Sequence, residues 1–476
     1  MAGAAVAGGW ALGYRIQLDG GGVPRLVTGT SVDAQAEAIE AHRAAAGDTP
    51  PPASPPSAPE VGATAVPEPM AGETPATDTA PSAEAPRPTP RLYWTGFRGP
   101  RRDGHYDERP IRTDWPAAGL TPLWKVPVGG GYASMAIAAG RAFTIEQRRA
   151  EEVVAAYDVA TGREVWRHAW PGDFKEWNGG DGPRATPTWH DGTLYALGAE
   201  GELRALDAAT GDQIWRVNIL EDNGATNLTW GMAASPLVVG DLVVVHPGGG
   251  AGRSIVAYDR RTGARRWSVL DDKAAYSSPV LATLAGEEQI LVLTATRLVA
   301  LEPGTGALVW SHPWPAPNDI NASQPVLVGG DRILLSSGYG KGASLVEVRE
   351  DDGVWATREV WTNNRLKNRF SSSVVLDGHI YGLDEAILTC LDIETGEVKW
   401  KAGRYGHGQI MLASGHLIVL SEDGDLALVR ATPERHDERA RFPVLAGKTW
   451  NHPVIDDGIL IVRNLAEMAA FDLRVP

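Results

Sequence analysis

The chain has 476 residues, with 44 lysines and arginines against 59 aspartates and glutamates, so its formal net charge is −15. Such an acidic chain lacks the basic face that a nucleic-acid backbone requires, which excludes this class of partner. With 43% hydrophobic and 22% charged residues, it has enough apolar side chains for a large folded core. The single cysteine, Cys390, excludes an intramolecular disulfide and cysteine-rich zinc sites, and its strand-like surroundings predict a buried structural thiol.

Residues 1–14 are uncharged and mostly apolar, and Arg15 follows them. A membrane-spanning helix needs about 20 apolar residues, and a secretory signal normally begins with Lys or Arg, so this run alone matches neither. We interpret it as the remnant of a signal or membrane anchor; the alternative is a flexible terminus of small residues. Residues 1–47 are thus expected to form a membrane-proximal segment outside the folded domain.

A short helix is predicted over residues 31–46, with Ser31 as its N-cap and with Glu37, Glu40 and Arg43 exposed. Thirteen of the chain's 34 prolines then fall within residues 48–90. A stretch of this composition buries too little apolar surface to offset its ordering entropy, so we expect an extended, semi-rigid spacer. The alternative is a dispensable low-complexity insertion.

One phrase recurs after residue 120: an acidic residue, two residues, Thr-Gly, three residues and Trp. Its five copies begin at Asp158, Asp207, Asp259, Glu302 and Asp392. They contain Gly162, Gly211, Gly263, Gly306 and Gly396, and they end at Trp166, Trp215, Trp267, Trp310 and Trp400. The first four tryptophans are 43 to 52 residues apart, which is typical of four-stranded propeller blades.

Each part of the phrase has a physical role. The glycine fits a tight turn that needs a positive φ, and the acid accepts hydrogen bonds from turn amides. We expect the tryptophan to wedge between neighbouring blades, where apolar burial contributes roughly 25 cal/mol per Å².

Three short apolar strands precede each phrase, and we expect the first strands to begin near Ser134, Thr186, Ala233, Ser277, Ser323, Ser371, Gln409 and His452. That makes eight units. The fifth (348–361, ending at Trp361) and the seventh (429–442) lack the phrase but keep an aromatic residue near its end. The eighth stops after its third strand, and the strand around Trp124 can supply the fourth, which removes an exposed edge. The sequence therefore predicts an all-β fold: an eight-bladed β-propeller of four-stranded antiparallel blades over residues 91–476, closed by an N-terminal strand.

At these residues the sequence resembles the quinoprotein alcohol dehydrogenase-like superfamily, whose PQQ-like repeat has the pattern Ala-x-Asp-x-x-Thr-Gly-x-x-x-Trp. Residues 94–104 are similar to the lead-in segment of many bacterial propellers of this group. The resemblance implies one of two branches. Pyrroloquinoline quinone (PQQ) dehydrogenases hold quinone and calcium at the propeller centre, whereas propellers of the outer-membrane protein assembly factor B type are non-enzymatic periplasmic lipoproteins.

The chain departs from both branches. It has no adjacent cysteine pair, no Cys-x-x-Cys-His haem site and no amino-terminal cysteine for lipidation. An anchor helix would have to replace the lipid. The resemblance is therefore specific for the fold, because one fold hosts many functions.

Functional residues of a propeller gather on the connections between blades and on the loops between second and third strands, which share one face around the channel. The candidate ligand-binding residues there are Trp177, Asp181, Arg184, Trp230, Tyr339, Lys367, Asn368, Arg369, Glu385, His407, Trp450, Asn451 and Arg463. If the cations converge, they would bind an anion, and Trp230 and Trp450 would supply a stacking wall. The alternative is that these side chains satisfy backbone carbonyls between blades.

Calcium could be bound by Asp384 and Glu385 together with Glu422 and Asn321. Adjacent acids in a loop are more often solvated, however, so we predict neither a metal site nor a cofactor, with PQQ and calcium kept as the alternative. A histidine such as His407 without a placed carboxylate is weak support for catalysis.

The predicted function is a non-catalytic extracytoplasmic scaffold that binds a protein or a small anionic ligand. We expect a periplasmic monomer tethered through its N-terminus, with the inner membrane as the place of the tether. The alternative is a PQQ-dependent alcohol or sugar dehydrogenase that uses the channel mouth. A sensor module would need an effector region, which the sequence does not show.

Overall fold

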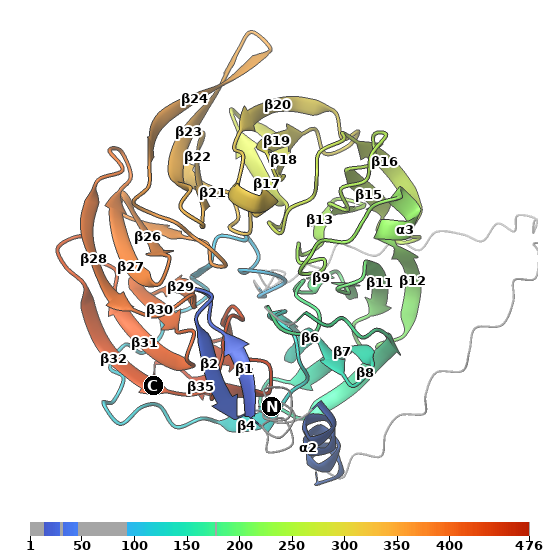
Figure 1. The fold of residues 1–476 in the computed structure, drawn as a ribbon, viewed down its shortest axis with the longest axis vertical. Coiled ribbons are helices and arrows are strands. Elements are labelled where there is room, and N and C mark those ends of the chain that lie inside the picture. Colours follow the sequence, from blue (N-terminus) through green and yellow to red (C-terminus); the bar gives the residue numbers. More distant parts are fainter. Residues whose placement is uncertain (1–13, 29–31, 46–92, 177–178, 476) are drawn as a thin grey trace, which may run out of the picture.

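In the computed structural model, the described residues are 14–28, 32–45, 93–176 and 179–475. Eight sheets form a ring around a central axis, which Figure 1 shows face-on. The predicted eight-bladed propeller and its all-β class are therefore confirmed. The described helices are α2 (Val32–Ala45), α3 (Ile219–Asn223) and the 3-10 turn η1 (Pro317–Asp319). None of these helices is long and apolar enough to cross a membrane.

The blades follow one another along the chain, each with its first strand nearest the axis (Figure 1). Blades 1 to 4 are β5 (Ala136–Ala138), β6 (Arg141–Arg148), β7 (Glu151–Asp158) and β8 (Glu164–Pro171); β9 (Thr188–His190), β10 (Thr193–Leu197), β11 (Glu202–Asp207) and β12 (Gln213–Asn218); β13 (Leu237–Val239), β14 (Leu242–Val245), β15 (Ile255–Asp259) and β16 (Arg265–Val269); and β17 (Val280–Leu284), β18 (Glu287–Leu293), β19 (Arg297–Leu301) and β20 (Leu308–Pro313). Blades 5 to 8 are β21 (Val326–Gly329), β22 (Arg332–Ser337), β23 (Gly342–Asp351) and β24 (Val354–Asn363); β25 (Val374–Leu376), β26 (His379–Asp384), β27 (Ile387–Asp392) and β28 (Val398–Arg404); β29 (Gln409–Ala413), β30 (His416–Leu420), β31 (Asp425–Arg430) and β32 (Asp437–Pro443); and β33 (Val454–Asp456), β34 (Ile459–Arg463), β35 (Glu467–Asp472) and β4 (Trp124–Pro127).

The fourth strand of a blade carries one extra residue directly before its repeat tryptophan. In blade 1, Ala156 pairs with Trp166 and Tyr157 pairs with Glu164, so Val165 has no opposite residue. The pairing of third and fourth strands shifts in the same way in blades 2 to 6, and in blade 7 the shift precedes Ala440 in place of a tryptophan. Because a bulge increases the local twist and re-aims a side chain, it directs the tryptophan toward the next blade.

The predicted wedge between blades is confirmed. The Trp166 indole donates to the carbonyl of Ala208 in the next blade at 3.2 Å, and a Cβ built on Gly211 would lie 2.6 Å from the same indole. The same contact between an indole and a phrase glycine is made by Trp124 with Gly162, Trp215 with Gly263, Trp267 with Gly306, and Trp361 with Gly396.

Two tryptophans face blades that have lost the phrase, and each finds another acceptor. Trp310 donates to the side chain of Gln289 in its own blade at 2.7 Å and shares a buried cluster with Ile333 of blade 5. Trp400 donates to the carbonyl of Thr432, which follows the third strand of blade 7, at 2.7 Å. The wedge is thus retained where the turn has diverged.

The ring closes as predicted. β4 pairs antiparallel with β35, which places Trp124 opposite Ala470, and the Trp124 indole donates to Val159 of blade 1 at 2.9 Å. Trp124 and Phe471 belong to the same buried cluster. The eighth blade therefore takes its outer strand from the beginning of the propeller.

The first strands begin two to four residues later than the sequence predicts, except β29, which begins at Gln409 as expected. The serine and threonine residues just before these strands form hydrogen bonds with the neighbouring blade, and they do not pair within their own sheet. The amide of Ser134 donates to Thr186 Oγ1 at 2.9 Å, that of Thr186 donates to Ser235 Oγ at 3.0 Å, and that of Ser235 donates to Ser278 Oγ at 2.9 Å.

The lead-in segment enters the central channel. Its strand β3 (His105–Tyr106) pairs parallel with β29. Arg98 donates to the carbonyls of Ser372 and Ser373 at 3.0 and 2.7 Å, and Arg102 donates to those of Ser235 and Pro279 at 3.2 and 3.0 Å. Both guanidinium groups are buried and join the first strands of several blades to one segment.

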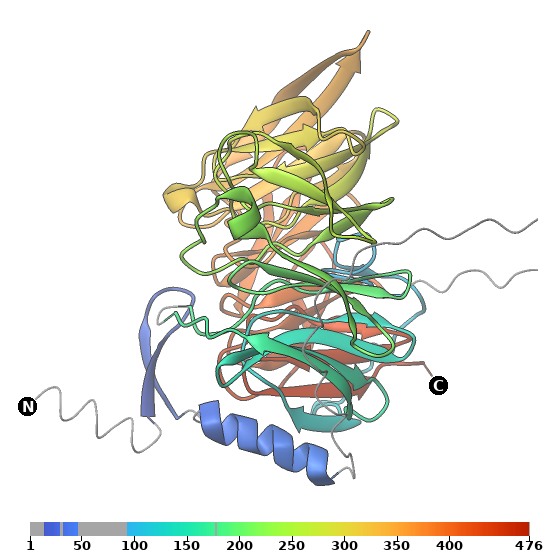
Figure 2. The same cartoon turned by 90° about the vertical axis from the view of Figure 1, so that its right-hand side faces the viewer.

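Residues 1–47 are expected from their sequence to lie outside the folded domain, but the described residues 14–28 and 32–45 lie against the propeller. β1 (Tyr14–Leu18) and β2 (Pro24–Thr28) form a hairpin beside one face of the ring, and α2 lies at its rim (Figure 2). The predicted helix is confirmed over residues 32–45, while its cap, Ser31, lies outside the described residues.

Glu37 and Glu40 are exposed as predicted, but Arg43 is buried. Its guanidinium lies 3.1 Å from the buried Glu164 carboxylate of blade 1, because the helix presents this side chain to the propeller. The proposed anchor run and the proline-rich spacer lie outside the described residues, apart from Tyr14.

Candidate functional site: the channel mouth

A cavity of about 360 Å³ opens at the face that carries the connections between blades. Seven aromatic side chains and two arginines are among its 21 lining residues. The aromatic side chains and the arginines are Phe97, Tyr132, Trp230, Tyr276, Tyr339, Phe370, Trp450, Arg184 and Arg369. Because Phe97 belongs to the lead-in segment, that segment contributes to the cavity wall.

The aromatic rings come from different blades and contact one another. The ring centroids of Phe370 and Trp450 are 4.6 Å apart, and those of Tyr132 and Trp450 are 5.0 Å apart. Trp230 and Tyr276 form a second pair at 5.7 Å. The rings of these pairs are tilted by 30° to 55°, so loops anchored by rigid blades build two aromatic walls of uneven surface, which suit apolar groups.

The two arginines are already oriented by protein groups. Arg184 donates to the carbonyls of Gly180 and Gly182, and its guanidinium lies 4.8 Å from the centroid of Phe174. Burial lowers the pKa of Arg184. Arg369 stacks 4.1 Å from the ring centroid of Tyr339, and it lies 3.7 Å from the Glu385 carboxylate.

Lys448 lies beside the mouth, where its ammonium is 3.9 Å from the ring centroid of Trp450 and donates to the carbonyl of Gly179 at 3.2 Å. Burial lowers the pKa of Lys448 to about 8, although the carboxylate of Glu422 favours its charged form. The mouth therefore holds three cations, Arg184, Arg369 and Lys448, next to the carboxylates of Glu385 and Glu422.

The tip of the β1–β2 hairpin also lines the cavity, through Asp19, Gly20 and Gly22. The amide of Gly20 donates to Glu422 Oε1 at 2.5 Å, and Arg369 donates to the carbonyl of Gly20. An amino-terminal segment is thus part of the site.

Five predicted residues line the cavity together: Arg184, Trp230, Tyr339, Arg369 and Trp450. Two others are close to them. Glu385 faces Arg369, and His407 lies under Gly20, with its ring centroid 5.7 Å from that of Phe370. Burial lowers the pKa of His407.

The remaining predicted residues support the structure around the mouth. Asp181 accepts from the amide of Glu176 at 3.0 Å, Asn368 donates to Ser373 Oγ at 2.9 Å, and Asn451 donates to the carbonyl of Ala133 at 2.9 Å. Trp177 lies outside the described residues.

The predicted convergence of cations does not include Lys367 or Arg463. The Lys367 ammonium lies 2.5 Å from the buried Asp384 carboxylate. Arg463 is 1% exposed and donates to Thr144 Oγ1 at 2.5 Å and to the carbonyl of Gly129 at 2.9 Å. The blade arrangement places Arg463 between blades 8 and 1 instead of in the mouth.

The oxygen ligands considered for calcium are used by protein groups. Asp384 is held by Lys367 and Lys401, and Ser337 donates to the side chain of Asn321. Glu422 accepts from Trp450 Nε1 at 3.0 Å and from the amide of His407 at 3.1 Å. Among the described residues, no group of three His, Cys, Asp or Glu side chains is arranged to hold a metal ion.

The thiol of Cys390 is buried in β27, as predicted, and its burial raises the pKa to about 12. The Cys390 thiol therefore stays protonated at neutral pH and has a structural role, unlike a reactive thiol, which is exposed and has a low pKa.

Sequence reasoning missed several residues of the mouth, including Tyr132, Tyr276, Gln409 and the hairpin tip. Tyr132, Tyr276 and Gln409 come just before or at the start of first strands, so their place in the repeat was an available signal. The tip had no such signal, because it lies before the repeats begin.

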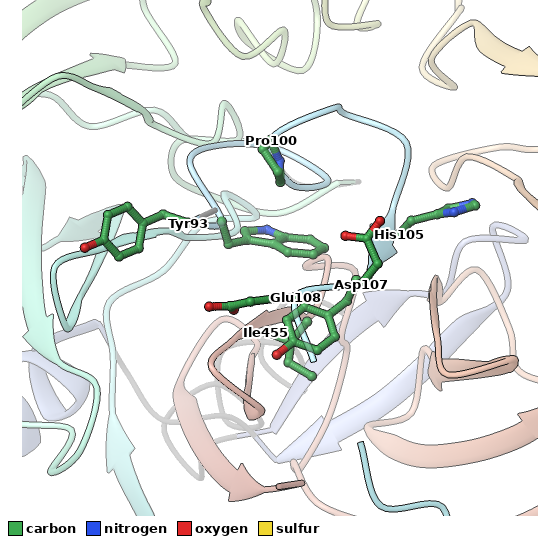
Figure 3. Close-up of a pocket in the computed structure, with 8 residues that line it drawn as sticks. Tyr93, Pro100, His105, Asp107, Glu108 and Ile455 are labelled. Atoms are coloured by element: carbon green, nitrogen blue, oxygen red, sulfur yellow. The ribbon is translucent and has the colours of Figure 1, made fainter. Parts of the chain in front are cut away.

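A second, much smaller cavity of about 10 Å³ lies between the lead-in segment and β33. Figure 3 shows Asp107, Glu108 and Ile455 around it. This volume holds about one water molecule, so it is not a ligand site.

Comparisons with known proteins agree with the fold. The sequence model of the family described as outer membrane protein assembly factor BamB matches residues 150–402. The BamB of Yersinia pestis is 25% identical over 261 residues, which cover 52% of this chain and 63% of that protein. The BamB of Burkholderia pseudomallei is 23% identical over 370 residues, which cover 68% of this chain and 91% of that protein. The chain thus spans less than two thirds of the length of the Yersinia relative.

The crystal structure of BamB from Moraxella catarrhalis superimposes with a TM-score of 0.51 at 17% identity, and the match covers 74% of this chain and 97% of that one. This likeness shows a shared fold. Because the family's sequence model matches more than half of the chain, across the blades that carry the repeat phrase, the protein belongs to the PQQ-like propeller family described as outer membrane protein assembly factor BamB.

Proposed function

We propose that this protein is a non-catalytic extracytoplasmic scaffold that assists the assembly of outer membrane proteins by binding a protein partner at the channel mouth. The observation that carries the proposal is the makeup of the mouth. It offers aromatic walls and three cations, and both these cations and the acids nearby are held in place by protein groups. Such a surface suits recognition of another protein, since aromatic residues and arginine dominate binding hot spots.

Family membership supports the biological role, because the relatives are named as assembly factors of outer membrane proteins. We further propose a periplasmic location and a tether that involves the apolar run at residues 1–14. These two features rest on the sequence and on the names of the relatives.

The proposal is tested by deleting the gene in the source organism and measuring the amount of folded β-barrel proteins in the outer membrane. We expect the deletion to lower this amount and the intact gene to restore it. A Trp230→Ala gene should restore less than half, because Trp230 forms part of the mouth wall. A matched control is Trp355→Ala, on β24 away from the mouth. Unchanged barrel levels after deletion would reject the proposed role.

The dehydrogenase alternative is tested separately with the purified full chain. We expect no stoichiometric uptake of PQQ with Ca²⁺ and no dye-coupled oxidation of alcohols or sugars. Tight uptake with turnover would overturn the non-catalytic assignment.

A further inference from the structure

We propose that the channel mouth recognises the tip of a β-hairpin in which an acidic residue precedes a glycine, and that residues 18–25 of this chain occupy the site as an internal competitor of a partner's hairpin. This inference rests on the proposed function, because it names the kind of partner that the mouth binds.

The first argument is that the propeller contacts both polar backbone groups of one residue. The amide of Gly20 donates to Glu422 Oε1 at 2.5 Å, and Arg369 donates to the carbonyl of Gly20. Glu422 is 5% exposed, so its hydrogen bond is sheltered from water. An acceptor and a donor that flank a single peptide residue form a recognition element for backbone, because backbone groups need such partners when buried.

The second argument is steric. A Cβ built on Gly20 would lie 2.2 Å from Cδ2 of His407, far inside van der Waals contact. A Cβ built on the neighbouring Gly21 would meet only the side chain of Asp19, at 3.2 Å. The mouth therefore excludes a side chain at the first glycine of the tip and tolerates one at the second.

The third argument concerns the acid. Asp19 Oδ1 accepts from the amides of Gly21 and Val23, both at 2.9 Å, and its carbonyl accepts from the amide of Gly22 at 2.9 Å. The carboxylate thus shapes the turn before it binds. Its other oxygen, Oδ2, lies 3.4 Å from the Arg25 guanidinium of the same hairpin, so the turn keeps its shape while Asp19 lines the cavity that Arg184 and Arg369 also line.

The hairpin is suited to displacement. β1 and β2 form a two-stranded sheet that pairs with no blade, and such a ribbon is marginally stable alone. At the end of the segment 18–25, Arg25 forms an ion pair with Asp423 at 2.6 Å, in which both side chains are at least half exposed. A partner's hairpin that is part of a larger sheet would be stabilised by its neighbouring strands, so we expect it to displace the β1–β2 hairpin from the mouth.

The helix that follows is held more firmly and keeps the tip at high local concentration. Gln35 donates to the carbonyls of Val128 and Leu465 at 2.6 and 2.5 Å, and Ile39 is buried. Because the tip is tethered beside the mouth, a partner's hairpin has to compete with it, and the apparent affinity of that hairpin for the mouth is lower than it would be for an empty mouth.

The first test measures hydrogen–deuterium exchange in full-length Gly20→Ala and in the matched control Gly21→Ala. We expect the segments 18–25 and 405–409 to exchange at least tenfold faster in Gly20→Ala, and we expect wild-type rates in Gly21→Ala. Thermal unfolding of the remaining propeller should be the same in both variants. Equal exchange in the two variants would overturn the steric argument and the proposal with it.

The second test adds a cyclised peptide with the sequence of residues 18–25 to the same full-length proteins. We expect it to bind Gly20→Ala at least tenfold more tightly than wild type, and binding should be lost when Glu422→Ala is added. A peptide with alanine at the position of Gly20 should not bind. Equally weak binding of the first peptide to both proteins would overturn recognition of a partner's hairpin.

The outcomes separate this inference from the proposed function. If no peptide binds while Trp230→Ala still impairs outer membrane assembly, only the hairpin recognition is rejected. If gene deletion leaves the outer membrane unchanged, the assembly role is rejected, and tight peptide binding to Gly20→Ala would still support recognition of a hairpin tip.

Discussion

Single residues of the repeat act in pairs that cross a blade boundary. Each glycine of the phrase has a φ between 67° and 81°, and it lies against the indole of the preceding blade. The glycine is therefore required twice, once for the turn and once for the contact. Sequence reasoning identified the first requirement, while the second became visible only when the blades were placed side by side.

This double requirement predicts that Gly211→Ala destabilises the propeller more than a glycine substitution that only strains the backbone. Gly192 is a matched control, because its φ is also 81° but a Cβ there would meet no atom within 4 Å. We expect Gly192→Ala to cost about 1–2 kcal/mol, and Gly211→Ala to cost about 2 kcal/mol more through displacement of Trp166. Urea unfolding measures both; equal losses would contradict the indole contact.

A buried carboxyl group in blade 1 predicts a pH dependence of stability. Glu152 accepts from the amide of Ala199 at 2.7 Å and from Trp170 Nε1 at 3.0 Å, and burial raises its pKa to about 7. Because the folded-state pKa exceeds the ordinary glutamate value of 4.5, the folded state binds the proton more tightly than the unfolded state does. Its contribution to stability is full below pH 4.5, falls as the pH rises to 7, and is constant above.

A rise of the Glu152 pKa from 4.5 to about 7 corresponds to a loss of about 3 kcal/mol in unfolding free energy between low and high pH. We expect the loss of unfolding free energy between pH 5 and pH 8 to be smaller in Glu152→Gln than in wild type. The exposed neighbour variant Glu151→Gln should follow the wild-type profile. If all three proteins lose the same free energy, Glu152 is not the titrating group.

At the scale of elements, α2 belongs to the folded unit because one of its charges is buried in blade 1. The side chains of Arg43 and Glu164 are 8% and 3% exposed, and Glu164 is shared with Arg148 at 2.6 Å. The sequence pattern of the helix led to the prediction that Arg43 is exposed, because such a pattern does not show which face of the helix lies against the propeller.

We therefore expect Arg43→Met to release α2, with a loss of about 2 kcal/mol in its local stability, because a buried carboxylate loses one of two cations. The control is Arg149→Met, whose ion pair with Asp33 of the same helix is more than half exposed on both sides. Hydrogen exchange of residues 32–45 measures the effect. Similar exchange in the two variants would show that the buried ion pair does not hold the helix.

At the scale of the whole molecule, stability depends on closure of the ring between β4 and β35. Trp124 supplies the wedge at this junction as the repeat tryptophans do elsewhere, although it lies before the first blade in the sequence. A ring closed in this way has no open sheet edge at its two ends.

Trp124→Ala is expected to cost about 3–5 kcal/mol, in the range for removing a large buried aromatic side chain. Leu123→Ala, at a side chain 48% exposed, should cost less than about 1 kcal/mol. Thermal unfolding measures the loss, and limited proteolysis should show cleavage near β4 first. A similar loss in both variants would mean that the junction does not depend on this indole.

The number of blades, the role of the tryptophans and the strand that closes the ring could all be predicted from the amino-acid sequence. These features follow from spacing within a repeat, and repeated local contacts leave the same pattern wherever they recur. The sequence also located the loops from which Arg184, Trp230 and Trp450 reach the channel mouth.

Only the tertiary structure decided which charges meet. It separated Arg463 and Lys367 from the mouth, and it brought the tip at Gly20 into the mouth from a distance of about 400 residues along the chain. Such contacts depend on the curvature of the ring and on the docking of a segment outside the repeats. Neither leaves a periodic signal, because each is made once and between residues with no fixed spacing.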